Sequence, residues 1–175
     1  MYLRPQGIPA NMVAVKIAPY VEQRAELRVY GTESGDDFDP DELTAQLGIA
    51  PHTVWRRGES LRSGRTRVAT VWWWQTETQS DPDSERLVQQ VLDIFEPVAE
   101  RLDEAKERWG LTFEIGLVVW MYLAKRGDED DTSAFAATPS MAFTGETLTR
   151  LTRLGASLDA DLYVDEIAAD DQETR

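Results

Sequence analysis

The sequence predicts a single α+β domain in which helices pack against a mixed or antiparallel β-sheet. Three observations indicate this fold class: segments with alternating apolar residues, two short helices with recognisable ends, and one long amphipathic helix. Their order along the chain is strand, helix, strand, long helix, strand, strand, helix, strand. We therefore expect one long and two short helices to cover the sheet.

The composition is that of a folded domain with an acidic surface. The chain has 175 residues, 42% of them hydrophobic, and this length suits one core. It contains no cysteine, which excludes disulfides and thiolate metal sites. Its net charge of −14 disfavours nucleic acid and anionic membranes as partners and favours a basic protein. No apolar run approaches the roughly 20 residues of a membrane span, and no signal segment is evident, so we expect a cytoplasmic protein.

The chain is expected to divide into three parts. Residues 1–24 form an N-terminal arm, with an edge strand over Met12–Ile17 as one alternative. Residues 25–164 form the globular domain. Residues 165–175, which are rich in acids, form a frayed tail.

The globular domain is expected to open with a strand and a short capped helix. Alternation over Ala25–Tyr30 predicts the strand. Asp39 is suited to cap the helix, Pro40 to occupy its first position, and Gly48 to end it in the left-handed conformation. After the helix we expect a turn that carries Trp55.

A run of three tryptophans lies in the next predicted strand, Val68–Thr76. Alternation places Trp72 and Trp74 on one face and Trp73 on the other. Aromatic exposure on both faces is unfavourable in water, so a helix is expected to cover at least one of them.

The covering element is predicted to be the long helix that starts near Ser84 and stops at Gly110. Apolar residues recur in it at spacings of three and four. Pro97 falls inside this helix, which predicts a kink or a break at that point.

The last third of the chain is predicted to hold three strands and a helix. Leu111–Leu123 is expected to be a central strand, Ser140–Phe143 a short strand, and Ser157–Val164 a strand buried on one face. The helix between the last two ends at Gly155, and its inner face is expected to carry Leu148, Leu151 and Leu154. This helix resembles the helix that begins at Pro40. The resemblance leaves open the alternative that the chain contains two related strand-helix-strand units.

Several short motifs follow one another in a recognisable order, and they are Tyr30-Gly31, Asp39-Pro40, Leu47-Gly48, the tryptophan-rich strand, and Leu154-Gly155-Ala156-Ser157-Leu158 before Asp161-Leu162-Tyr163. Over Glu26 to Val164, this order resembles a bacterial family, the domain of unknown function 4279. The family has no established activity or cofactor. The resemblance implies a role like that of immunity proteins in bacterial toxin systems, and no functional residue is carried over.

No residue pattern in the chain indicates catalysis or metal binding. His52 is the only histidine, and no spacing selects a serine and an acid to act with it. The acids between Asp36 and Asp41 lack the glycine and closing glutamate of a calcium loop. We therefore expect neither an enzyme nor a cofactor.

One basic segment is the candidate site for a partner or an anion; it comprises Trp55, Arg56, Arg57, Arg62, Arg65 and Arg67. Arginine and tryptophan are frequent at interface hot spots. In the alternative interpretation these arginines pair with the chain's own acids in a solvated loop.

The leading hypothesis is a non-catalytic, immunity-like binding protein with a basic partner. The second is a sensor of a small anion or nucleotide that uses loop 56–67. The sequence indicates no oligomeric state.

Overall fold

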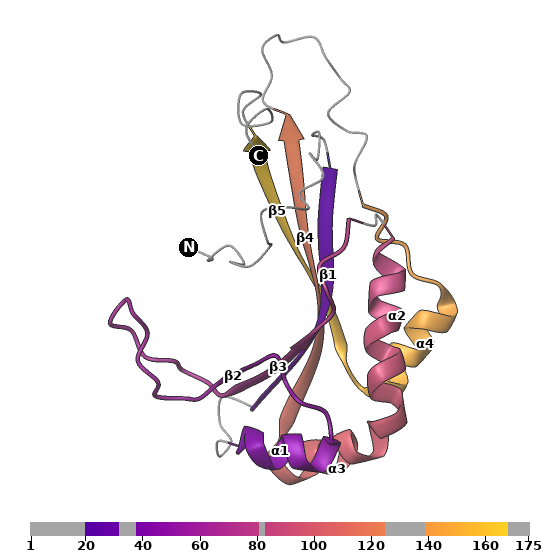
Figure 1. Ribbon diagram of the computed structural model, residues 1–175. Coiled ribbons are helices and arrows are strands. Elements are labelled where there is room, and N and C mark those ends of the chain that lie inside the picture. Colours follow the sequence, from indigo (N-terminus) through magenta and orange to yellow (C-terminus); the bar gives the residue numbers. More distant parts are fainter. Residues whose placement is uncertain (1–19, 32–37, 81–82, 125–138, 168–175) are drawn as a thin grey trace.

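The computed structural model describes residues 20–31, 38–80, 83–124 and 139–167. Five strands form one sheet in the order β2-β3-β1-β4-β5 (Figure 1). The strands are β1 (Tyr20–Gly31), β2 (Thr53–Trp55), β3 (Val71–Gln75), β4 (Leu111–Ala124) and β5 (Ser157–Ile167). All neighbours are antiparallel except β4 and β5, which are parallel. The predicted α+β fold with a mixed sheet is confirmed.

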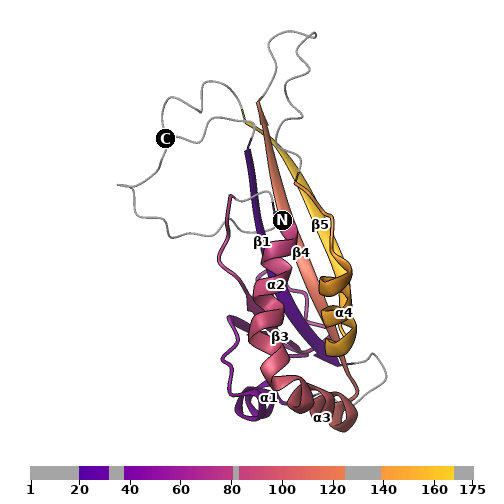
Figure 2. The ribbon, with the colours of Figure 1, turned by 90° about the vertical axis from the view of Figure 1, so that its right-hand side faces the viewer.

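The helices lie together on one side of this sheet. They are α1 (Pro40–Leu47), α2 (Ser84–Phe95), the 3-10 turn η1 (Glu96–Val98), α3 (Ala99–Trp109) and α4 (Gly145–Leu154). Helices α2 and α4 run along β1, β4 and β5, whereas α1 and α3 lie at one end (Figure 2). None of the described helices is both long and apolar enough to cross a membrane.

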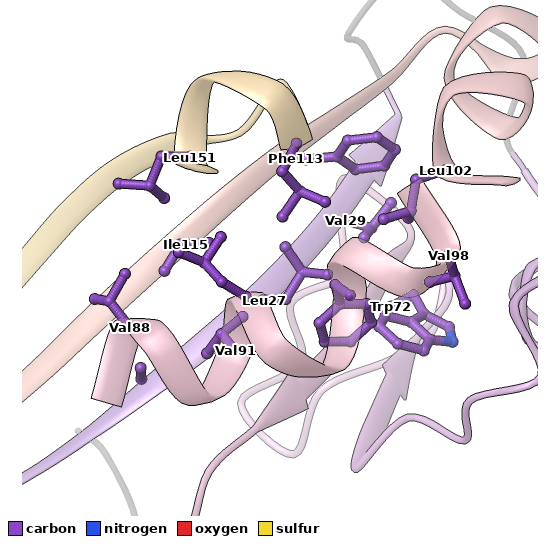
Figure 3. Packing of buried hydrophobic residues seen from close by; sticks show 14 of the residues in the cluster. Leu27, Val29, Trp72, Val88, Val91, Val98, Leu102, Phe113, Ile115 and Leu151 are labelled. Atoms are coloured by element: carbon purple, nitrogen blue, oxygen red, sulfur yellow. The ribbon is translucent and has the colours of Figure 1, made fainter. Parts of the chain in front are cut away.

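The core fills the space between the helices and one face of the sheet (Figure 3). Leu27 and Ile115 of the sheet and Val91 of α2 are fully buried there. Trp72 is also fully buried, and its ring lies edge-on to that of Phe95 at 6.1 Å between centroids. The prediction that a helix covers the Trp72 face is confirmed.

The helix ends follow the predicted chemistry. Asp39 accepts a hydrogen bond from the N–H of Asp41 at 2.9 Å, and Gly48 ends α1 with a φ of 71°. The long helix breaks at Pro97, because proline lacks the N–H for the helical ladder and its ring clashes with the preceding turn. The chain bridges this break with η1.

Three predicted boundaries are corrected by the structure. β1 begins at Tyr20 rather than Ala25, and β5 ends at Ile167 rather than Val164, because both pair in register with the long strand β4. The strand with the three tryptophans is shorter than predicted, at Val71–Gln75. The edge strand expected over Met12–Ile17 and most of the expected tail lie outside the described residues.

Four predicted features also differ, and the first is β5, which was expected to be buried on one face but has Leu162 and Val164 exposed. The expected turn at Trp55 is the short strand β2, paired with β3. Ser140–Phe143 is not a strand and makes only a single bridge, from Ser140 to Asp83. Leu148 is 49% exposed, and Thr147 takes its place on the inner face of α4. The two suggested strand-helix-strand units differ in topology, since β1 and β3 are antiparallel whereas β4 and β5 are parallel.

Glu85 of α2 joins the N-terminal ends of α2 and α4. Its carboxylate accepts hydrogen bonds from the hydroxyl of Thr144 at 2.6 Å, the hydroxyl of Thr147 at 2.5 Å and the N–H of Thr144 at 2.8 Å. These hydrogen bonds lower the pKa of Glu85. The charged form therefore stabilises the fold above the ordinary glutamate pKa of about 4.3, and this contribution is lost as the pH falls through the lowered value.

We expect the Glu85→Gln variant to melt several degrees below the parent at pH 7. The difference should shrink as the pH falls through the lowered pKa of Glu85, because the parent then loses the same charge. Thermal unfolding followed by circular dichroism from pH 7 to pH 3 measures this. Glu107→Gln on the exposed face of α3 is the matched control. An equal difference at all pH values would contradict the assigned role of Glu85.

Candidate functional site

The face of the sheet opposite the helices carries a cluster of charged and aromatic side chains. We call it the helix-free face, and its members are Arg24, Glu26, Arg28, Tyr30, Trp55, Val71, Trp73, Glu114, Val118, Trp120, Asp161 and Tyr163. These residues line an open pocket of about 370 Å³. They meet because alternate residues of a strand point to the same side of a sheet, and all five strands contribute.

A buried carboxylate stands at the centre of the helix-free face. The side chain of Glu26 is fully buried, and its two oxygens accept hydrogen bonds from the Nε atoms of Arg24 at 2.7 Å and Arg28 at 2.9 Å. Arg28 also donates to Glu114 and Asp161, both at 3.0 Å. A buried charge is tolerated only when it is paired in this way.

The guanidinium group of Arg28 lies directly over Gly116 of β4. A Cβ atom at position 116 would lie 2.9 Å from the Cζ of Arg28, so any larger residue would displace this group. Burial alone would lower the pKa of Arg28, but Glu26, Asp161 and Glu114 outweigh it and raise the pKa. Gly116 is therefore the position that admits this arginine to the pocket.

Tyr30 extends the same network. Its hydroxyl donates a hydrogen bond to Glu114 at 2.8 Å. Burial and this hydrogen bond raise the pKa of Tyr30 to about 12, so the phenol remains a donor at neutral pH.

Aromatic rings and guanidinium groups form a row across the sheet from β2 to β5. The guanidinium of Arg24 lies 5.5 Å from the ring centroid of Trp73 and 4.9 Å from that of Trp120. Trp73 meets Trp55 edge-on at 5.5 Å, and Trp120 stacks on Tyr163 at 6.1 Å. Such contacts between cations and aromatic faces are favourable. The row thus presents several aromatic rings on a face that no described helix covers.

The basic segment predicted as a candidate site is only partly drawn into this face. Trp55 lines the pocket, and Arg67 lies over its ring at 3.9 Å. Arg56 instead pairs with Asp39 at 3.3 Å and Asp41 at 2.7 Å.

The rest of that segment forms a small hairpin beyond the sheet (Figure 1). Hydrogen bonds from Gly58 N–H to Arg67 O and from Arg67 N–H to Glu59 O, both at 2.9 Å, close it. Arg57, Arg62 and Arg65 are exposed on this hairpin. The structure therefore does not bring the six predicted residues together.

The charged members of the helix-free face were missed by sequence reasoning. Arg24, Glu26 and Arg28 alternate with apolar residues of β1, and Glu114 interrupts an apolar strand. A charge at every second position of a predicted strand was the available signal. It did not indicate which strands are neighbours, and so did not predict the network.

His52 has a local role in the structure. Its Nδ1 accepts a hydrogen bond from the N–H of Gln75 at 3.2 Å, and its ring lies edge-on to Trp74 at 5.6 Å. Among the residues with described positions, no three histidine, aspartate or glutamate side chains are grouped as metal ligands.

Comparison with known protein families identifies the family of the chain. The model of a domain of unknown function, DUF4279, matches residues 21–165. The chain belongs to this family. The match runs from β1 into β5, so in this DUF4279 protein it includes every member of the helix-free face. No curated protein and no solved structure matched the chain.

Proposed function

We propose that this DUF4279 protein is a non-catalytic binding protein whose recognition surface is the helix-free face. The observation that carries this proposal is the row of aromatic rings and guanidinium groups across the helix-free face. Tryptophan, tyrosine and arginine are the residues enriched at interface hot spots. This face concentrates all three around a pocket.

The ion network supports a role beyond stability. A buried ion pair is often no more stabilising than apolar packing of the same volume. Glu26, Arg24 and Arg28 nevertheless occupy the centre of the helix-free face, where apolar side chains would fit a purely structural sheet. Fixed charges beside aromatic rings supply specificity, which a recognition surface needs.

The partner that we propose is a basic protein, as in the immunity-like role implied by the family resemblance. Support comes from the net charge of −14, which would steer a basic domain such as a toxin nuclease toward this chain and accelerate capture. A cytoplasmic location is part of this proposal. The absence of cysteine suits a reducing compartment.

A sensor of small anions that uses loop 56–67 is the second candidate, with less support. Arg56 is paired with two aspartates, and Arg67 is stacked on Trp55 and lies 3.8 Å from Glu59. Because Arg67 lies on Trp55, an anion bound by the loop should change the fluorescence of that indole. A flat fluorescence titration with nucleotides and inorganic phosphate would remove this candidate.

The proposal is tested by capture of a partner from native lysate with matched variants. We expect the tagged parent to retain a protein in stoichiometric amounts, and the Trp120→Ala, Tyr163→Ala double variant to lose it. Removal of hot-spot residues weakens binding by about 2 kcal/mol or more, roughly 30-fold. Circular dichroism checks that each variant is folded.

The control is the Arg56→Glu, Arg57→Glu double variant, which alters the basic segment outside the pocket. It should retain the partner. Loss in this control with retention in the Trp120→Ala, Tyr163→Ala variant would move the site to loop 56–67 and contradict the proposal.

A further inference from the structure

Two side chains that line the pocket have hydrogen-bond donors without an acceptor among the described residues. Arg24 uses only its Nε, on Glu26, although its side chain is 14% exposed. Within the described part of the chain its Nη1 and Nη2 atoms donate to no residue. The Nε1 atom of Trp73 is buried and likewise lacks a partner among the described residues. Buried donors without an acceptor are costly, so this part of the pocket favours a group with acceptor oxygens.

An acceptor with spare capacity lies across one strand from Arg24. Asp161 accepts from Arg28 through Oδ2 alone, and its side chain is 38% exposed. In the sheet register Arg24 is opposite Val118, and Val118 is opposite Asp161. Val118 is buried and gives the pocket an apolar floor between a donor and an acceptor.

The charges of the pocket restrict the ligand further. Its lining holds two guanidinium groups, Arg24 and Arg28, and three carboxylates, which are those of Glu26, Glu114 and Asp161. The sum is −1, so a ligand with only negative charge is repelled by the carboxylates. A molecule with a negative and a positive end meets an opposite charge at each end.

We infer that the pocket binds a small dipolar molecule with a planar apolar body. Its carboxylate end takes the free Nη donors of Arg24, its ammonium end takes Asp161, and its body lies over Val118 beside the ring of Trp120. A volume of about 370 Å³ is within the size range of small-molecule sites. This inference goes beyond a protein partner, although it places the ligand on the same face.

Calorimetric titration of the purified full chain tests the inference with three matched probes. These are 4-(aminomethyl)benzoate, which has both ends, 4-methylbenzoate, which lacks the ammonium, and 4-methylbenzylamine, which lacks the carboxylate. We expect the first to bind at least tenfold more tightly than either of the others. Tryptophan fluorescence should report the same titration, because Trp55, Trp73 and Trp120 line the pocket.

Two conservative variants test the contacts of the two ends of the ligand separately. Arg24→Lys keeps the charge but loses the planar pair of donors. It should lower the affinity for the dipolar probe and for 4-methylbenzoate at least tenfold. Asp161→Asn should lower the affinity for the dipolar probe to that for 4-methylbenzoate. It should not lower the affinity for 4-methylbenzoate itself. Asp41→Asn, on the helix side, should change none of the three affinities.

Equal affinity for all three probes, or no binding of the dipolar probe by the folded parent at millimolar concentration, would overturn the inference. Retention of a basic protein partner in that case would leave the proposed function standing. The two ideas are thus separately tested.

Discussion

Replacement of Glu26 by alanine is expected to lower the free energy of unfolding by about 3–5 kcal/mol. The side chain of Glu26 is fully buried, and both of its oxygens are paired with arginines. Its removal leaves the guanidinium groups of Arg24 and Arg28 close together and largely out of water without their shared counter-charge. Urea denaturation of the two proteins at pH 7 measures the change.

An exposed ion pair of the same chain is the control for Glu26. Glu42 accepts from Arg108 at 3.0 Å, and both side chains are more than half exposed, at 54% and 61%. Glu42→Ala should change the free energy of unfolding by less than about 1 kcal/mol. A loss of similar size in both variants would show that Glu26 is not the centre of a buried network.

Replacement of Trp72 by alanine should lower the free energy of unfolding by about 3–5 kcal/mol. The ring is fully buried between β3 and the helices and lies edge-on to Phe95. Its Nε1–H donates to the hydroxyl of Thr44 at 3.0 Å, which ties the sheet to α1. Trp72→Phe keeps most of the ring but loses this hydrogen bond, and should cost roughly 1 kcal/mol for the hydrogen bond in addition to any loss of packing.

Trp120 is the matched control for Trp72, because it is a half-buried indole on the opposite face of the same sheet. Trp120→Ala removes the ring beside Arg24 and should cost about 1 kcal/mol through the lost cation–π contact, apart from the apolar area that it exposes. Thermal or urea unfolding compares the two variants. Equal losses would contradict the assignment of Trp72 to the core and Trp120 to a recognition surface.

Local chemistry explains which parts of the fold were predictable from sequence. A cap such as Asp39, a terminating Gly48 and a break at Pro97 act through neighbouring residues, so their effects can be inferred without tertiary structure. The alternation of Trp72, Trp73 and Trp74 is equally local. Only the choice of which face is buried depends on α2, and the need to cover aromatic rings predicted that a helix would do so.

The remaining features depend on contacts between distant segments. β2 has three residues and exists because β3 pairs with it. The environment of Leu148 depends on where α2 lies, which no local pattern indicates. The basic segment was selected from its composition. Arg56, however, forms ion pairs with Asp39 and Asp41 only once the start of α1 lies beside the end of β2. The pocket requires β1 to lie between β3 and β4, and this strand order is a property of the whole chain.

The position of β5 bears on self-association. As an outer strand in the described sheet, it turns one row of backbone N–H and C=O groups away from β4, and such an edge can pair with another copy of the chain. Leu162 and Val164 are exposed on this strand and would favour that pairing. Asp159, Asp161 and Asp165 alternate with them, so two copies meeting edge to edge would bring like charges together. The acids of β5 therefore disfavour edge-to-edge pairing of two copies.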